Sequence, residues 1–206
     1  MSLIIHKGCC YLIVLFLLET VALSPCYAQT KTWELSRENS RIEFSIKYLM
    51  FGKIKGEFRE FDATFMSEKP DFSEADIEIK IYTNSIETGN EKRDSDLKSE
   101  NLFFVNKYPE MNFHGKQIEL VKDNIYKISG DLRIKDITRT VILDAIRLGG
   151  DTAKDNQTIT EWQISAIIKR SDYNLKLSRL KEVLAGDKVR IDIKVEFLLQ
   201  RSDESF

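Results

Sequence analysis

In residues 188–199, KVRIDIKVEFLL, polar and apolar side chains alternate from Lys188 to Phe197. Successive side chains of an extended strand point to opposite faces of a sheet, so the apolar set shares one face. That set comprises Val189, Ile191, Ile193, Val195 and Phe197. The same alternation recurs in RIEFSIKYLM (41–50), ADIEIKIY (75–82), NIYKISGDLRI (124–134) and TEWQISAII (160–168). The pattern predicts a sheet protein whose strands each bury one face.

The predicted strands number about eight, at 41–50, 54–66, 75–82, 112–120, 124–135, 139–149, 158–170 and 188–199. In IKGEFREFDATF (54–65) the apolar phase changes between Phe58 and Phe61, which predicts a bulge or bend near Arg59 and Glu60. The connections VKDN (121–124) and KDI (135–137) are short and polar, as hairpins require. About eight antiparallel strands in one domain favour a closed barrel or a sandwich, and such a barrel is either filled by side chains or holds one small ligand.

The first 28 residues read as a targeting segment. Lys7 precedes an apolar run from Tyr11 to Leu18, and the run is followed by Cys26-Tyr27-Ala28. This arrangement predicts a signal peptide cleaved after Ala28, which leaves 29–206 as one domain. The apolar run is shorter than the ~20 residues of a membrane-spanning helix. An uncleaved anchor and a lipid-modified Cys26 are the less favoured alternatives.

Composition narrows the classes of function. All three cysteines and His6 lie in the leader, so His114 is the single histidine of the mature chain. No Cys, His or acidic residue stands at metal-ligand spacing from His114, so we expect neither a metal site nor a cofactor. The formal charge of −2 gives no footprint for nucleic acid. Because no nucleophile–base set is apparent, we do not expect an enzyme.

One charged segment interrupts the alternation. TGNEKRDSDLKSENLFF (88–104) is rich in helix-compatible residues. Thr88 and Glu91 match a capping box, with Asn90 as the alternative N-cap. We expect 88–105 to form one or two short helical turns that act as a partial lid at one mouth of the barrel. Its inward side would carry Leu102, Phe103 and Phe104.

Four segments of the mature chain keep the order of motifs known from one bacterial family. They are NSRIEFSIKYLMFGKIKGEF (39–58), SIETGNEKRDSDLKSENLFFVNKYPEMNF (85–113), GDLRIKDITRTVIL (130–143) and IIKRSDYNL (167–175). The second segment is the most specific, with Ser-Ile-x-Thr, Arg-Asp, Phe-Phe and Tyr-Pro in order. On these residues, nearly the whole mature chain resembles the YceI-like family of secreted bacterial proteins.

The resemblance implies an all-β fold, namely an extended, lipocalin-like, eight-stranded antiparallel β-barrel with a short helical segment near 88–105. It also implies a lumen that binds a long amphiphilic isoprenoid, of polyprenyl or quinone type, in a periplasmic or secreted protein. The family's histidines fall at Asn39, Tyr48 and Asp96 here, so contacts that depend on imidazole are not carried over. A glycine of the family pattern is Asn174 in this chain.

The expected partner is therefore an isoprenoid or other long-chain lipid, and a homodimer is left open. The residues expected to line the lumen are Phe44, Ile46, Tyr48, Phe58, Phe103, Phe104 and Trp162. Ordinary core packing would use the same residue types, which leaves open a non-catalytic, stress-related interaction module with a filled core.

The charged pair Arg93-Asp94 is the sharpest polar candidate. Arg93 would reach a phosphate or carbonyl head group, and Asp94 would hold it through a charge-assisted hydrogen bond. The alternative is a salt bridge that anchors the helical segment to the barrel rim. Arg170, Ser171 and Asp172 are expected to form a structural turn.

Overall fold

The computed structural model describes residues 31–49, 52–69, 72–149, 152–154, 157–177 and 184–200. The expected signal peptide, its cleavage site and Cys26 lie outside the described residues. The strands are β1 (Lys31–Leu35), β2 (Arg41–Tyr48), β3 (Gly52–Phe58), β4 (Phe61–Ser67), β5 (Asp76–Tyr82), β6 (Ile86–Glu87), β7 (Glu110–Lys122), β8 (Ile125–Ile134), β9 (Ile137–Arg147), β10 (Thr152–Lys154), β11 (Gln157–Lys169) and β12 (Ala185–Leu199). The helical elements are η1 (Arg37–Asn39), η2 (Thr83–Ser85), α2 (Glu91–Lys98) and η3 (Arg170–Tyr173).

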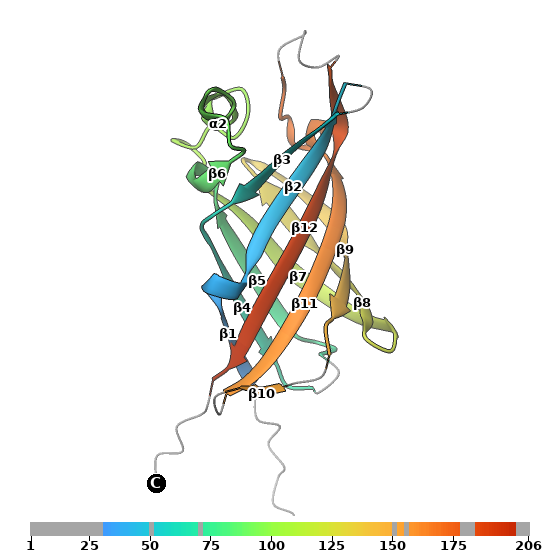
Figure 1. Cartoon of the computed structure of the whole chain (residues 1–206). Coiled ribbons are helices and arrows are strands. Elements are labelled where there is room, and N and C mark those ends of the chain that lie inside the picture. The colour runs from blue at the N-terminus through green and yellow to red at the C-terminus, as the bar shows by residue number, and fades with distance from the viewer. Residues whose placement is uncertain are drawn as a thin grey trace, which may run out of the picture.

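The sheet closes on itself through antiparallel pairs in the order β1-β4-β5-β7-β8-β9-β11-β12, and β12 returns to β1 (Figure 1). The predicted eight-stranded antiparallel barrel is therefore confirmed. Three further strands extend it, since β2 pairs with β12, β3 with β2 and the two-residue β6 with β3. Thus β1–β2, β3–β4 and β5–β6 each act as one long strand with a break in the middle. We call the half of the barrel next to α2 the upper half and the half next to β10 the lower half (Figure 1).

The break in the second long strand lies where the apolar phase changes. β3 ends at Phe58 and β4 begins at Phe61, and both rings are buried. Side chains three residues apart in a regular strand would face opposite sides, so the intervening Arg59 and Glu60 must break the pleat. The predicted bend is confirmed. β1 was not predicted, because five residues give too short a pattern, although its Trp33 is fully buried.

Aromatic side chains fill the lower half of the barrel. The ring of Phe65 lies 5.5 Å from Phe197, and the ring of Trp162 lies 5.4 Å from Phe72 and 5.0 Å from Tyr126, measured between centroids. Phe72 belongs to the loop between β4 and β5 and enters the barrel from below, with the Arg147 guanidinium 4.7 Å from its ring centroid. The void left among these side chains is only about 40 Å³. This half is a packed core.

Candidate functional site

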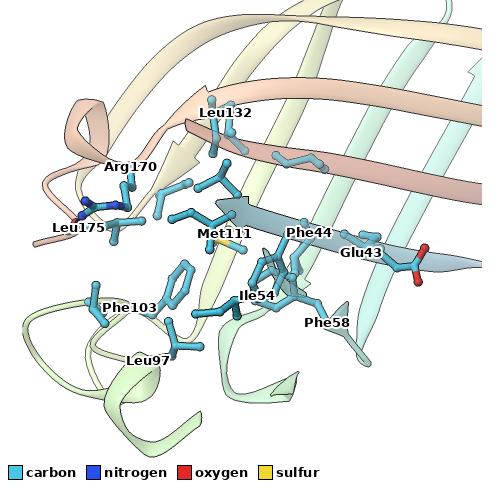
Figure 2. A pocket seen from close by; sticks show the side chains of 18 of the residues that line it. Glu43, Phe44, Ile54, Phe58, Leu97, Phe103, Met111, Leu132, Arg170 and Leu175 are labelled. Atoms are coloured by element: carbon cyan, nitrogen blue, oxygen red, sulfur yellow. Dashed lines mark hydrogen bonds between the residues drawn. The ribbon is translucent and has the colours of Figure 1, made fainter. Parts of the chain in front are cut away.

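A cavity of about 500 Å³ occupies the upper half of the barrel. Its wall is built from inward-facing apolar side chains of the strands, among them Phe44, Ile54, Phe58, Met111 and Leu132 (Figure 2). Ligand pockets commonly measure ~300–1,000 Å³ and are lined mainly by apolar groups. The cavity therefore has the size and the lining of a site for a small apolar ligand or part of a larger one.

Two features leave the upper half hollow. Most of its inward side chains are aliphatic, whereas those of the lower half include large rings. In addition, β9 pairs with β11 only from Asp144 to Arg147, opposite Ser165 to Trp162. Beyond Asp144, β9 continues with β8, and β11 continues with β12. The strands therefore diverge toward the upper end, and the space between them widens.

Polar groups reach the cavity mainly near the upper end. The helix α2 contributes Lys92, Arg93 and Asp96, together with Asn90 just before it, and η3 contributes Arg170. A lumen that is apolar along its wall and polar at its mouth matches the two ends of an amphiphilic molecule.

Hydrogen bonds tie the first turn of α2 to Thr88, the residue that follows β6. The Asn90 side chain accepts a hydrogen bond of 2.9 Å from the backbone N–H of Arg93, so Asn90, not Thr88, is the N-cap. Arg93 donates from Nε to the Thr88 hydroxyl (2.8 Å) and from Nη2 to the Thr88 carbonyl (2.9 Å). Thr88 in turn donates from its backbone N–H (2.9 Å) and its hydroxyl to Asp94. The expected hydrogen bond from Arg93 to Asp94 is thus replaced by a link through Thr88.

At the aromatic end of this segment, Leu102 and Phe103 face the cavity and Phe104 does not. Leu102 is buried, and Phe103 lines the cavity and packs edge-on against Phe58, with 5.8 Å between centroids (Figure 2). Phe104 has a φ of 48°, does not line the cavity, and places its ring 6.1 Å from that of Tyr108. The left-handed backbone at Phe104 turns the chain, so its side chain leaves the inward direction of Phe103. The inward orientation predicted for Phe104 is wrong.

The other predicted lumen residues also divide. Four of them line the cavity: Phe44, Ile46, Tyr48 and Phe58. Trp162 does not; it borders the small void of the lower half instead. The Phe44 ring lies against Gly56 on the neighbouring strand, where an added Cβ would come within 2.4 Å of Phe44 Cζ. Glycine at position 56 therefore makes room for this part of the wall.

The three positions where the family has histidine have separate surroundings. Tyr48 and Asp96 line the cavity near its mouth. Asn39 lies elsewhere and donates to the Glu196 carboxylate over 2.7 Å. The mouth therefore keeps polar side chains at two of these positions, without an imidazole.

The turn predicted after β11 is present and has a second role. Arg170 is buried, lines the cavity, and donates to the carbonyls of Gly186 (3.1 Å) and Leu175 (3.0 Å). Burial raises the pKa of the neighbouring Tyr173 phenol to about 12, with the Asp172 charge adding to the effect. Asn174, where the family has glycine, adopts a φ of 55°, a conformation that asparagine tolerates better than most residues. The sequence alone did not indicate that this turn borders the lumen.

The surroundings of His114 correct an expectation. Its Nδ1 lies 2.6 Å from Glu78 Oε1. One carboxylate oxygen of Asp76, one of Glu78 and one ring nitrogen of His114 all lie within 4.8 Å of one another. β5 and β7 place Glu78 and His114 directly opposite each other, which residue spacing could not reveal. The expectation that His114 has no acidic partner is therefore wrong. The three side chains are exposed and do not line the cavity.

Across the residues that the structure describes, every helix is too short or too polar to cross a membrane.

Comparisons with known proteins agree with this architecture. The family model for the YceI-like domain matches residues 33–197. The UPF0312 protein SA2479 of Staphylococcus aureus is 32% identical over 163 residues, which cover 77% of this chain and 92% of that one. The UPF0312 protein ECA1782 of Pectobacterium atrosepticum is 32% identical over 139 residues, covering 67% and 71%.

Solved structures share the fold. The Campylobacter jejuni YCEI protein matches with a TM-score of 0.64 and 27% identity, over 76% of this chain and 90% of that one. BcnA of Burkholderia cenocepacia matches with a TM-score of 0.71 and 20% identity, over 79% and 99%. A polyisoprenoid binding domain from Saccharophagus degradans matches with 0.62 and 15%, over 82% and 98%. The last two, at such low identity, bear on the fold alone, but the domain match and the curated relatives place the chain by sequence: it belongs to the YceI-like family.

Proposed function

We propose that this protein is a binding protein that holds a long amphiphilic isoprenoid lipid, of polyprenyl or quinone type, with its chain inside the upper half of the barrel. The observation that carries the proposal is the apolar cavity of about 500 Å³ with polar groups at its mouth. Moving apolar surface out of water contributes roughly 25 cal/mol per Å², so a flexible hydrocarbon chain gains most from such a lumen.

The mouth would hold the polar head of the lipid. Lys92 and Arg93 of α2 and its N-cap Asn90 offer hydrogen-bond donors, and the lining also includes Arg170 of η3. Donors of this kind suit a phosphate or a carbonyl oxygen. Membership of the YceI-like family supports the proposal, as does the likeness in fold to a domain described as polyisoprenoid binding.

Binding without catalysis is part of the proposal. Among the described residues, those that line the cavity include no histidine, cysteine, serine or threonine. Its described wall therefore lacks the Ser, Thr or Cys nucleophile and the imidazole base of a triad-type hydrolase. The alternative of a stress-related interaction module with a filled core fits the lower half of the barrel but leaves the upper cavity without a role.

We also propose that the protein is exported, to the periplasm or beyond the cell, after removal of residues 1–28. The support is the sequence of that segment. Protein purified from its native host would then have the intact mass of a chain that begins at Gln29. A mass that includes residues 1–28 would contradict export by cleavage, and additional acyl mass on Cys26 would indicate a lipoprotein.

A pair of identical substitutions tests the binding site. Ile191 lines the cavity from β12, so Ile191→Trp adds volume inside the lumen. Ile167 is 64% exposed on the outer face of β11, so Ile167→Trp is the matched control. Delipidated protein would be titrated with farnesol by displacement of a fluorescent probe. We expect binding by the wild type and by Ile167→Trp, and its loss in a folded Ile191→Trp. Absence of binding in the wild type, or equal affinity in all three, would reject the proposal.

A further inference from the structure

A layer of side chains separates the cavity from the lower half. Five residues border both the large cavity and the small void beneath it: Ile42, Ile79, Phe113, Leu143 and Ile193. They come from β2, β5, β7, β9 and β12, so the layer crosses the barrel from wall to wall. We call these five residues the floor. Layers of inward side chains from several strands are how small barrels are filled.

The floor is held in place from the sides and from below. Ile42 pairs directly with Ile193 across β2 and β12, and Ile79 pairs with Phe113 across β5 and β7. All five side chains are buried, and the aromatic cluster around Trp162 supports them from the lower half. Closely packed aromatic side chains leave few alternative rotamers, so a ligand cannot push the floor down without opening the core.

A glycine on the adjacent strand fixes the ring of Phe113. A Cβ added at Gly130 would come within 2.5 Å of Phe113 Cζ, so the ring lies directly against the β8 backbone. Without that glycine the ring would have to move. The position of Phe113, and with it the level of the floor, is therefore built into the sheet.

The cavity above the floor has a limited capacity. A water molecule in the liquid takes ~30 Å³, and a carbon of a packed chain with its hydrogens needs a similar volume. A cavity of about 500 Å³ therefore holds on the order of 15 to 20 carbons. This corresponds to roughly three or four isoprene units by the same estimate. A longer chain must leave part of its length outside the mouth.

Resting on the proposed lipid-binding function, we infer that the floor sets the length of isoprenoid chain that this protein encloses. Only the isoprene units enclosed between the floor and the mouth contribute to affinity. Longer chains still bind, but their additional units lie outside the mouth and add no affinity.

Prenyl alcohols of increasing length test this limit. Geraniol, farnesol, geranylgeraniol and solanesol would compete with a bound fluorescent probe on the full mature protein. We expect affinity to rise by roughly tenfold or more for each enclosed unit, because each unit buries several carbons, and then to level off at farnesol or geranylgeraniol. Affinity that keeps rising to solanesol in the wild type would overturn the inference.

Two variants should move the plateau in opposite directions. Leu143→Ala opens the floor into the void below and should shift the plateau to longer chains. Val141→Phe, on the same face of β9 above the floor, fills the cavity and should shift the plateau to shorter chains. Ile164→Ala is the control, since Ile164 borders the lower void but is not part of the floor.

The outcomes separate the two proposals. If no alcohol binds the wild type, the lipid-binding function itself fails. If alcohols bind but the plateau stays unchanged in both floor variants, or moves equally in Ile164→Ala, the floor does not set the length. Should Leu143→Ala not fold, Val141→Phe decides alone, because it adds volume to an existing space and removes no core contact.

Discussion

The two halves of the barrel share long strands such as β7, β8 and β12, and they differ in the size of the side chains that point inward. In the lower half, Trp33, Phe65, Phe72, Trp162 and Phe197 leave a void of about 40 Å³. In the upper half, mostly aliphatic side chains leave about 500 Å³. The contrast indicates that the packed lower half contributes most of the stability, whereas the upper half provides the space for a ligand.

The largest expected effect comes from the lower half. Trp162→Ala removes a buried ring that contacts Phe65, Phe72 and Tyr126, and should reduce the free energy of unfolding by about 3–5 kcal/mol. Chemical denaturation measures the loss, and probe displacement measures farnesol affinity on the folded fraction. Affinity should stay close to that of the wild type. A variant that keeps its stability but loses the ligand would reverse the roles of the two halves.

In the upper half we expect the opposite pattern. Phe103→Ala removes a half-buried ring that covers the lumen against Phe58, so farnesol affinity should fall by about tenfold or more while stability falls by less than in Trp162→Ala. Phe104→Ala is a matched control one residue away, because Phe104 does not line the cavity. Equal losses of affinity in the two variants, measured side by side, would show that Phe103 does not contact the ligand any more than Phe104 does.

A pH effect should arise beside the mouth. The Tyr173 phenol has a pKa of about 12 in the fold against an ordinary value of 10, because burial disfavours its anion. Its pKa is raised by folding, so its contribution to stability is complete below pH 10 and is lost as the pH rises from 10 to 12. The loss amounts to roughly 2–3 kcal/mol at about 1.4 kcal/mol per pKa unit.

Tyr173→Phe isolates this contribution. Among the described residues, the buried Tyr173 hydroxyl has no hydrogen-bond partner, so its removal should cost little below pH 10. Unfolding free energies measured from pH 8 to 12 should fall less steeply in the variant than in the wild type. Parallel curves would mean that the phenol is solvated in the folded protein.

The smallest effect is expected on the outer face. His114 is exposed and contacts Glu78 outside the lumen, so His114→Ala should change stability by no more than about 0.5 kcal/mol and leave farnesol affinity unchanged. Thermal melting and probe displacement on the same sample provide the check. A marked loss of ligand would link the outer face to the cavity.

The alternation of side chains was enough to predict about eight antiparallel strands, because it assigns each residue to one face of a strand. The choice of a barrel over a sandwich came from the resemblance to the YceI-like family. The phase change between Phe58 and Phe61 even located the break between β3 and β4. Alternation cannot reveal whether the enclosed space is full, since Ile191 beside the cavity and Val195 in the packed half follow the same pattern. Cavity size depends on how facing side chains meet across the barrel.

The predictions that failed depended on three-dimensional details of this kind. Trp162 points inward as expected, but its position along β11 places it in the lower half. Phe104 follows Phe103 directly, yet its left-handed backbone turns it away from the lumen. The contact between His114 and Glu78 depends on the register of β5 with β7, which no local pattern contains. By contrast, the charges and caps of 88–105 are local signals, and α2 was predicted from them.

The most direct test of the divided barrel uses its own tryptophans. Trp33 and Trp162 are the two tryptophans of the sequence, and both lie in the lower half, below the floor. A prenyl lipid brominated at the end of its chain quenches indole emission on contact. With bound lipid confirmed by probe displacement, wild-type emission should remain almost unchanged, whereas a tryptophan introduced by Phe58→Trp in the wall of the cavity should be strongly quenched. Strong quenching of the wild-type tryptophans would show that the chain passes the floor and would contradict the division of the barrel into a packed half and a binding half.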